Sequence, residues 1–158
     1  MRGERRDVPA ERNHEELAVL KNDGYNMLVD LTCVDYLSQN KTPRFDVIYR
    51  LMKFDLVDGN DLGRVELHCS TGEAPVLRSV KDLWPVADWL EREVWDMYGV
   101  RFCDRPDIKR LLMYEEFVGH PLRKDYPIAK RQPLIGPKSG EKADSPSFNI
   151  LKPVVTGE

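Results

Sequence analysis

The chain contains three histidines, and histidine is the side chain that hydrolases, nucleophilic enzymes and metal sites most often use. His14 lies at the start of an expected helix, His68 on the polar face of an expected strand, and His120 in a Gly-His-Pro turn. No two of them have the spacing of a local metal site, and the chain has neither an HExxH motif nor a nucleophile elbow. The sequence therefore predicts no independent catalytic site.

Other residue types that carry chemistry are equally scattered. The cysteines Cys33, Cys69 and Cys103 form no CxxC pair, so we expect reduced thiols in a cytosol-like compartment and no bound metal. The glycines form neither GxGxxG nor GxxxxGK[ST], which gives nucleotide binding no support. Adjacent acids such as Glu115 and Glu116 are typical of a solvated surface.

Composition narrows the class of partner. The 158 residues include 24 basic and 27 acidic side chains, for a net charge of −3, so a general attraction to nucleic acid or anionic lipid is not indicated. An RNA platform built on Arg44, Tyr49 and Arg50 has no RNP-like aromatic pattern behind it. No apolar run approaches the roughly 20 residues that span a bilayer, and the charged start lacks a signal core. We expect a soluble protein, neither secreted nor membrane-spanning.

The elements that must position these residues follow from hydrophobic periodicity. A short amphipathic helix is predicted over residues 11–21, closed by Asn22-Asp23-Gly24. Alternating patterns predict strands over 27–37, 44–54 and 64–70, paired as an antiparallel meander. A second helix is predicted from Val86 to Gly99. The fold class is α+β, with a small antiparallel or mixed sheet packed against helices.

Each predicted strand has one apolar face that should point into the core. The first strand places its apolar side chains at alternate positions, and the other two follow the same rule. The predicted inward residues are Met27, Val29, Leu31, Cys33, Leu37, Phe45, Val47, Tyr49, Leu51, Val65, Leu67 and Cys69.

The second helix, which contains EREVWDMYGV, carries two residues on unexpected faces. With about 100° of rotation per residue, Val86, Leu90, Val94 and Met97 form its core-facing stripe. Trp95 falls on the opposite face with Asp88, Glu91 and Arg92, where it either lies against a local loop or contacts another protein. Glu93 falls on the edge of the stripe, where it either reaches outward or is a buried carboxylate held by an arginine or backbone donors. We expect the paired, structural carboxylate.

The last third of the chain has a different texture. Seven prolines follow residue 105, and the segment 122–140 is basic with a few interspersed apolar residues. Such a segment cannot fold a core alone, and is either disordered or laid along a partner. We predict a core domain over residues 1–118 and an extended strap and Pro-rich tail over 119–158.

Three ordered blocks, EREVWDMYGVRF, PDIKRLLM and EEFVGHPLRKDYP, closely resemble the signature region of the thirty-kilodalton subunit of NADH:quinone oxidoreductase, respiratory complex I. LVDLTCVDYL and FDVIYRL also resemble that family, so the likeness covers roughly residues 17–127. Two departures stand out. Arg105 occupies a position where the family signature leads us to expect a histidine, and a strand that often precedes the first helix is not evident. We therefore expect the sheet to lack an edge strand.

The resemblance implies a non-catalytic structural subunit in the peripheral, quinone-module arm of a proton-translocating complex. Its partners would be other hydrophilic-arm subunits, especially the quinone-site and iron–sulfur subunits. It implies no cofactor in this chain, with FMN, iron–sulfur clusters and quinone held by other subunits. It places the chain on the cytoplasmic side of a bacterial inner membrane, with contact to the membrane only through the complex.

No catalytic residue is carried over from the resemblance. Two groups of residues are assigned roles instead. The predicted subunit interface comprises Trp95, Asp96, His120, Arg123, Lys124, Asp125 and Tyr126, and the predicted structural residues are Glu91, Arg92, Glu93 and Gly99. Two alternatives stay open: the equivalent subunit of a ferredoxin- or coenzyme F-dependent dehydrogenase or energy-converting hydrogenase, and, more remotely, a free-standing enzyme or binding module.

Overall fold

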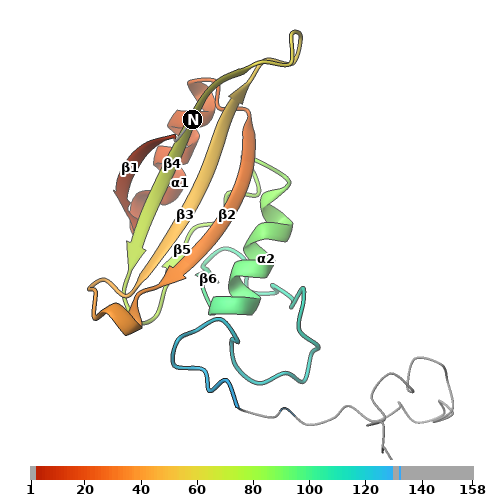
Figure 1. Ribbon diagram of the computed structural model, residues 1–158. Helices are drawn as coiled ribbons and strands as arrows, with labels where there is room; N and C mark the ends of the chain where they lie inside the picture. Colours follow the sequence, from red (N-terminus) through yellow and green to blue (C-terminus); the bar gives the residue numbers. More distant parts are fainter. Residues whose placement is uncertain (1–2, 130–131, 133–158) are drawn as a thin grey trace, which may run out of the picture.

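The computed structural model describes residues 3–129 and 132, and its centre is a four-stranded mixed sheet of order β1-β4-β3-β2 (Figure 1). The strands are β1 (Glu4–Pro9), β2 (Met27–Asp35), β3 (Phe45–Phe54) and β4 (Asp61–Thr71). Strands β2, β3 and β4 pair antiparallel, and β1 runs parallel to β4 at the edge. The α+β class, with a small sheet against helices, is confirmed.

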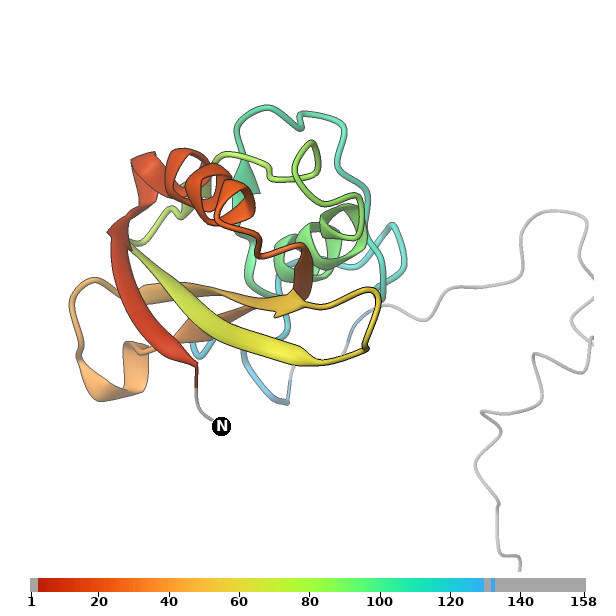
Figure 2. The ribbon, with the colours of Figure 1, turned by 90° about the horizontal axis from the view of Figure 1, so that it is seen from above.

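Both α-helices lie on the same face of this sheet, as the view along it shows (Figure 2). They are α1 (Asn13–Asn22), which follows a 3-10 turn η1 (Ala10–Arg12), and α2 (Ala87–Tyr98). A second 3-10 turn, η2 (Leu37–Gln39), follows β2, and a short parallel pair joins β5 (Val76–Leu77) to β6 (Arg101–Phe102). The core therefore lies between the sheet and the two helices.

The alternating patterns of β3 and β4 gave the correct core residues. Seven predicted side chains on these strands are fully buried: Phe45, Val47, Tyr49, Leu51, Val65, Leu67 and Cys69. They belong to one cluster with Leu17 and Leu20 of α1 and Ala87 and Val94 of α2. Burial also raises the pKa of the Cys33 and Cys69 thiols to about 12, so both are protonated at neutral pH.

The predicted inward face of β2 is partly wrong. Leu31 and Cys33 are buried as expected, but Met27 and Val29 are exposed, and Leu28 is buried in their place. The register with β3 shifts between Leu28 and Asp30, which marks a bulge. A bulge adds one residue to one strand, so the alternation of faces reverses there and a period-two pattern reads the wrong side.

The prediction that the sheet lacks an edge strand is also wrong, because β1 is that strand. Its sequence, ERRDVP, has no apolar alternation, and all but one of its residues are exposed. Arg5 pairs with Asp7 at 2.6 Å and Arg6 with Glu4 at 3.1 Å. Charged side chains are typical of edge strands, where they discourage pairing with other chains, and they leave no hydrophobic signal.

The core-facing side of α2 differs from the prediction. Val94 and Met97 are buried, but Val86 is exposed, Glu93 is exposed, and Glu91 is fully buried. The buried carboxylate is therefore Glu91 and not Glu93. The loops after α2 also cover its far side, so the helix is buried on two sides and only a narrow strip with Val86, Trp89 and Glu93 remains open.

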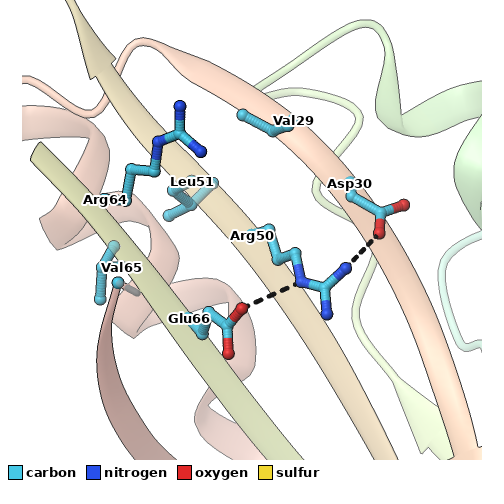
Figure 3. A pocket seen from close by; sticks show the side chains of 8 residues that line it. Val29, Asp30, Arg50, Leu51, Arg64, Val65 and Glu66 are labelled. Carbon is cyan, nitrogen blue, oxygen red and sulfur yellow. Dashed lines mark hydrogen bonds and ion pairs between the residues drawn. The ribbon is translucent and has the colours of Figure 1, made fainter. Parts of the chain in front are cut away.

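The sheet face away from the helices is polar. Arg50 lies between Asp30 and Glu66 at 3.1 Å and 3.0 Å, so it bridges β2, β3 and β4 (Figure 3). These side chains line a hollow of about 420 Å³. Farther along the same face, Nδ1 of buried His68 lies 2.9 Å from Asp46. The charges on this face are paired with one another, which is the arrangement of a solvated sheet surface.

Candidate functional site

The carboxylate of Asp96, in the last turn of α2, is the centre of the first cluster. It is fully buried, and its Oδ2 accepts hydrogen bonds from the backbone N–H groups of Leu111, Leu112 and Met113 at 3.0, 2.8 and 2.9 Å. Its Oδ1 accepts a bond from Nη1 of Arg110 at 2.5 Å. Asp96 therefore ties four consecutive residues of the following loop to the helix.

Arg110 extends this cluster toward residue 119. Its Nη2 donates to the carbonyl oxygens of Phe117 at 2.8 Å and Gly119 at 3.1 Å. Burial by itself would raise the pKa of the Asp96 carboxyl, but the bonds from Met113, Arg110 and the neighbouring backbone outweigh burial and lower it. Asp96 is therefore ionised at neutral pH.

Trp95 lies against the strap instead of standing free in solvent. The ring of His120 meets it edge-on, with centroids 6.2 Å apart and an interplanar angle of 72°, and the Arg110 guanidinium lies 5.5 Å from its centre. Nδ1 of His120 donates to the Asp96 carbonyl oxygen at 3.0 Å. The local-loop interpretation of Trp95 accounts for this side of the ring.

Gly99 ends α2 in the left-handed conformation, with φ of 75°, and its N–H bonds to the Trp95 carbonyl. A Cβ atom here would lie 2.7 Å from Cδ2 and Nε2 of His120. Glycine is therefore required twice, once by the backbone conformation and once by the approach of the strap. The structural role predicted for Gly99 fits this geometry.

Asp35, at the end of β2, is the centre of the second cluster. Arg44 binds it in a bidentate pair at 2.9 and 2.7 Å, and the backbone N–H of Lys124 donates to its Oδ2 at 2.9 Å. Arg44 also contacts Glu73 at 2.7 Å and Asp125 at 3.1 Å. Hydrogen bonds from Arg44, opposed by burial, hold the pKa of Asp35 well below its ordinary value.

The remaining strap residues lie along the same end of the sheet. Arg123 donates to the Glu73 carbonyl at 3.2 Å, and its guanidinium lies 5.0 Å from the Phe45 ring centre. Tyr126 stacks on Phe117 with centroids 5.9 Å apart. The strap, residues 119–127, is thus packed on its own domain through both clusters.

Glu91 is the centre of the third cluster. Its carboxylate accepts bonds from the Ser79 hydroxyl and the Val80 N–H, both at 2.8 Å, and from Arg105 at 2.9 Å. Arg105 also reaches Asp88 at 2.5 Å. Burial raises the pKa of Glu91 although these donors oppose it. Arg105, which departs from the family signature, therefore holds a buried acid of α2.

Two hollows open on either side of Trp95. One, of about 380 Å³, is lined by Glu73, Ala74, Pro75, Val76, Trp95, Gly99, Arg101, His120 and Arg123. The other, of about 430 Å³, is lined by Val76, Trp95, Arg101, Phe102, Cys103, Arg105, Pro106 and Ile108. Trp95 and Arg101 lie between them. This basic and aromatic surface, which we call the Trp95 surface, is the candidate functional site.

The structure brings most of the predicted site residues together. Trp95, Asp96, His120 and Gly99 meet at the end of α2, while Arg123, Lys124 and Asp125 meet the Asp35 cluster. Arg92 donates to the carbonyls of Lys109 and Arg110 at 3.2 and 2.9 Å, in keeping with a structural role. Asp96 is fully buried in its own chain, so it can act on a partner only through the loop it holds. That these residues contact another subunit stays a prediction.

Asp35 and Arg110 were not recognised from the sequence, and Arg44 was considered only for RNA. One signal was present. Asp96 lies in the last turn of a helix, where the macrodipole disfavours an acid, so a specific set of donors was to be expected there. Asp35 gives no such signal, because its partners are distant in the chain.

Two further findings concern the described residues alone. Within residues 3–129 and 132, no group of three or more His, Cys, Asp or Glu side chains could hold a metal ion. In the same part of the chain, neither helix has the length and apolar character needed to cross a bilayer. The predicted tail beyond Gln132 lies outside the described residues, and the boundary at 118 stays a prediction.

Comparison with known proteins gives a consistent result. A family model described as the 30 Kd subunit of respiratory-chain NADH dehydrogenase matches residues 6–132. The C-type subunit of NADH-quinone oxidoreductase from Citrifermentans bemidjiense is 42% identical over 132 residues, which are 82% of this chain and 78% of the relative. NADH-quinone oxidoreductase subunit 5 from Thermus thermophilus is 39% identical over 131 residues, 81% of this chain and 63% of the relative.

A solved structure is also similar. It is the trypsin-resistant fragment (1-134) of Nqo5, with a TM-score of 0.60 and 37% sequence identity. The match covers 65% of this chain and 80% of that one. The resemblance read from the sequence blocks is thereby confirmed.

Proposed function

The chain belongs to the family of the 30-kDa subunit of respiratory-chain NADH dehydrogenase, and we propose that it is a non-catalytic structural subunit of the peripheral arm of an NADH:quinone oxidoreductase. Its partners are other subunits of the hydrophilic arm, in particular the quinone-site and iron–sulfur subunits. FMN, iron–sulfur clusters and quinone are held by those subunits. The chain lies on the cytoplasmic side of the membrane and reaches it only through the complex.

The observation that carries this proposal is the use made of the three buried carboxylates. Asp96, Asp35 and Glu91 each accept bonds from backbone N–H groups and from an arginine of the same chain. A general acid or base needs reach to a substrate proton, whereas these oxygens are directed at fixed donors. The acids that could have carried chemistry hold loops and the strap in place.

Such anchoring suits a surface that positions a neighbour. Ordering a strap when two proteins meet costs conformational entropy, and a strap already held by Asp35 and Asp96 avoids much of that cost. The Trp95 surface then offers a partly open indole beside Arg101 and Arg123. Tryptophan and arginine are among the residue types most enriched at the positions that dominate protein interfaces. Acidic side chains of a partner fit between them.

The test is assembly of the complex around altered chains. Trp95→Ala combined with truncation at Gly119 removes the strap and the indole that packs on it. We expect the peripheral arm to lose this chain, and NADH-to-quinone activity to fall, while NADH oxidation by an artificial acceptor persists. Lys124→Glu changes only an exposed side chain of the strap, since the Lys124 N–H forms the anchor, and it covers the case in which the truncated chain fails to fold.

Val19→Ser is the matched control, because Val19 is an exposed apolar residue on α1 that does not line the Trp95 surface. It should leave assembly unchanged. Full assembly and full activity with both the truncated double variant and Lys124→Glu would show that the strap does not serve as an interface.

A further inference from the structure

A second apolar surface lies at the end of the molecule where the β3–β4 hairpin projects beyond the sheet (Figure 1). Leu56 and Val57 at the hairpin tip are 81% and 91% exposed, and Val86 and Trp89 on the open strip of α2 are 48% and 57% exposed. Between hairpin and helix runs a groove of about 280 Å³, lined by Asn26, Met27, Leu28, Phe54, Leu56, Trp84, Pro85 and Val86. We call this the hairpin groove.

The apolar side chains of this surface are not accounted for by the core. Val86 and Trp89 are three residues apart on α2 and so lie on one face of the helix, which sequence periodicity placed inward. The structure turns that face outward, beside the groove. Scattered single apolar residues on a surface are ordinary, but a contiguous set around a groove marks a contact site.

The charge around the groove restricts what can bind. The hairpin, residues 55–61, contains three aspartates and no basic residue. Asp61 pairs with Arg64 at 2.6 Å, and Asp55 accepts the Val57 N–H at 2.8 Å. Among the described residues, the Asp58 carboxylate at the tip has no hydrogen bond or ion pair. A ligand that covers Leu56 and Val57 therefore meets an unpaired acid.

We propose that the hairpin groove docks a second protein partner, through an apolar segment of that partner flanked by lysine or arginine. The groove lies below the usual volume of small-molecule pockets, which begin near roughly 300 Å³, so it suits side-chain anchors better than a cofactor. An acidic tip opposes both anionic lipid and nucleic acid. Two copies of this chain joined symmetrically through the groove would bring like charges together. The proposal goes beyond the Trp95 surface, and makes the chain a bridge between two neighbours.

The test uses a photo-reactive amino acid at Val57 of the full chain in the assembled complex, with the cross-linked peptide identified by mass spectrometry. The expected product joins Val57 to another subunit, at a segment that contains apolar residues and lysine or arginine. A product with residues 133–158 of the same chain, a product with a second copy, or no product would each overturn the proposal. A probe at Lys124 in a parallel sample reports on the strap, so failure there and failure here are read separately.

A competition experiment measures the energetic contribution. Differently tagged wild-type and Leu56→Ser/Val57→Ser/Asp58→Lys chains are offered together during assembly. We expect at least tenfold less of the variant in the complex, with an unchanged unfolding midpoint because all three positions are exposed. Val19→Ser is again the control and should be incorporated like the wild type. Equal incorporation of the triple variant would overturn the proposal.

Discussion

A Cβ atom at Gly99 would lie 2.7 Å from Nε2 of His120, which places the end of α2 directly against the strap. His120 in turn donates from Nδ1 to the carbonyl oxygen of Asp96, in the turn that Gly99 closes. Helix end, imidazole and strap are thus fixed by one close approach. No change at Gly99 can be made without moving the ring.

Gly99→Ala should destabilise the domain through two separate effects. The left-handed conformation costs a side chain about 1–2 kcal/mol, and displacement of His120 adds about 1–3 kcal/mol as an overpacking cost. Gly59→Ala is the matched control, because Gly59 has φ of 72° and nothing within 4 Å of its Cβ position. Urea unfolding of both variants separates the effects. Equal losses in the two variants would mean that the His120 contact contributes nothing.

Asp96→Asn should be among the most damaging conservative changes in the chain. The amide keeps the shape but loses the charge that faces Arg110, and it turns donors toward backbone N–H groups. Removing one partner of a buried pair costs about 3–5 kcal/mol, out of a typical total of about 5–15 kcal/mol. Glu93→Gln, on the exposed strip of the same helix, should change the free energy of unfolding by less than about 0.5 kcal/mol. If urea unfolding ranked the two variants alike, Asp96 would not be an anchor.

Sequence periodicity succeeded where one side of an element faces the core and failed where this condition does not hold. It placed Tyr49 and Leu67 correctly because β3 and β4 are regular strands. It missed β1, whose charged edge carries no pattern, and it reversed Val29, because a bulge leaves no mark in single residues. For α2 it took Val86 for core, since it could not know that later loops would cover the other side.

The candidate site could be predicted only in part for a related reason. The sequence blocks identified Trp95, His120 and the strap. The anchors are long-range: the Asp35 carboxylate meets Lys124, and Arg105 meets Glu91. Carboxylate and donor are brought together by the tertiary fold, and neither residue carries that information alone. Arg105 was expected to put an imidazole role in doubt, and the structure gives it a role of its own as the arginine that holds Glu91.

Glu91→Gln should cost less than Asp96→Asn at pH 7, although both acids are fully buried. Burial raises the pKa of Glu91 above its ordinary 4.5, so its charged form is disfavoured in the folded state. The stability that this carboxyl contributes is fully present below about pH 4.5 and is lost as pH rises through the folded-state pKa. The advantage of the wild type over Glu91→Gln should therefore shrink between pH 4.5 and pH 7. Urea unfolding at both values checks this, and an advantage that grows with pH would contradict it.

His120 should titrate below its ordinary pKa of 6.5, because burial disfavours the imidazolium and the nearby Arg110 and Arg123 repel it. The Asp96 carbonyl can only accept a hydrogen bond, so the neutral ring must carry its proton on Nδ1. The stability linked to this group is complete above pH 6.5 and is lost as pH falls through the lower folded-state pKa. Nitrogen-15 NMR of the imidazoles would show the Nδ1–H tautomer and a depressed midpoint. His120→Gln should remove that resonance, His14→Gln should leave it, and a midpoint above 6.5 would mean that the strap does not cover the ring.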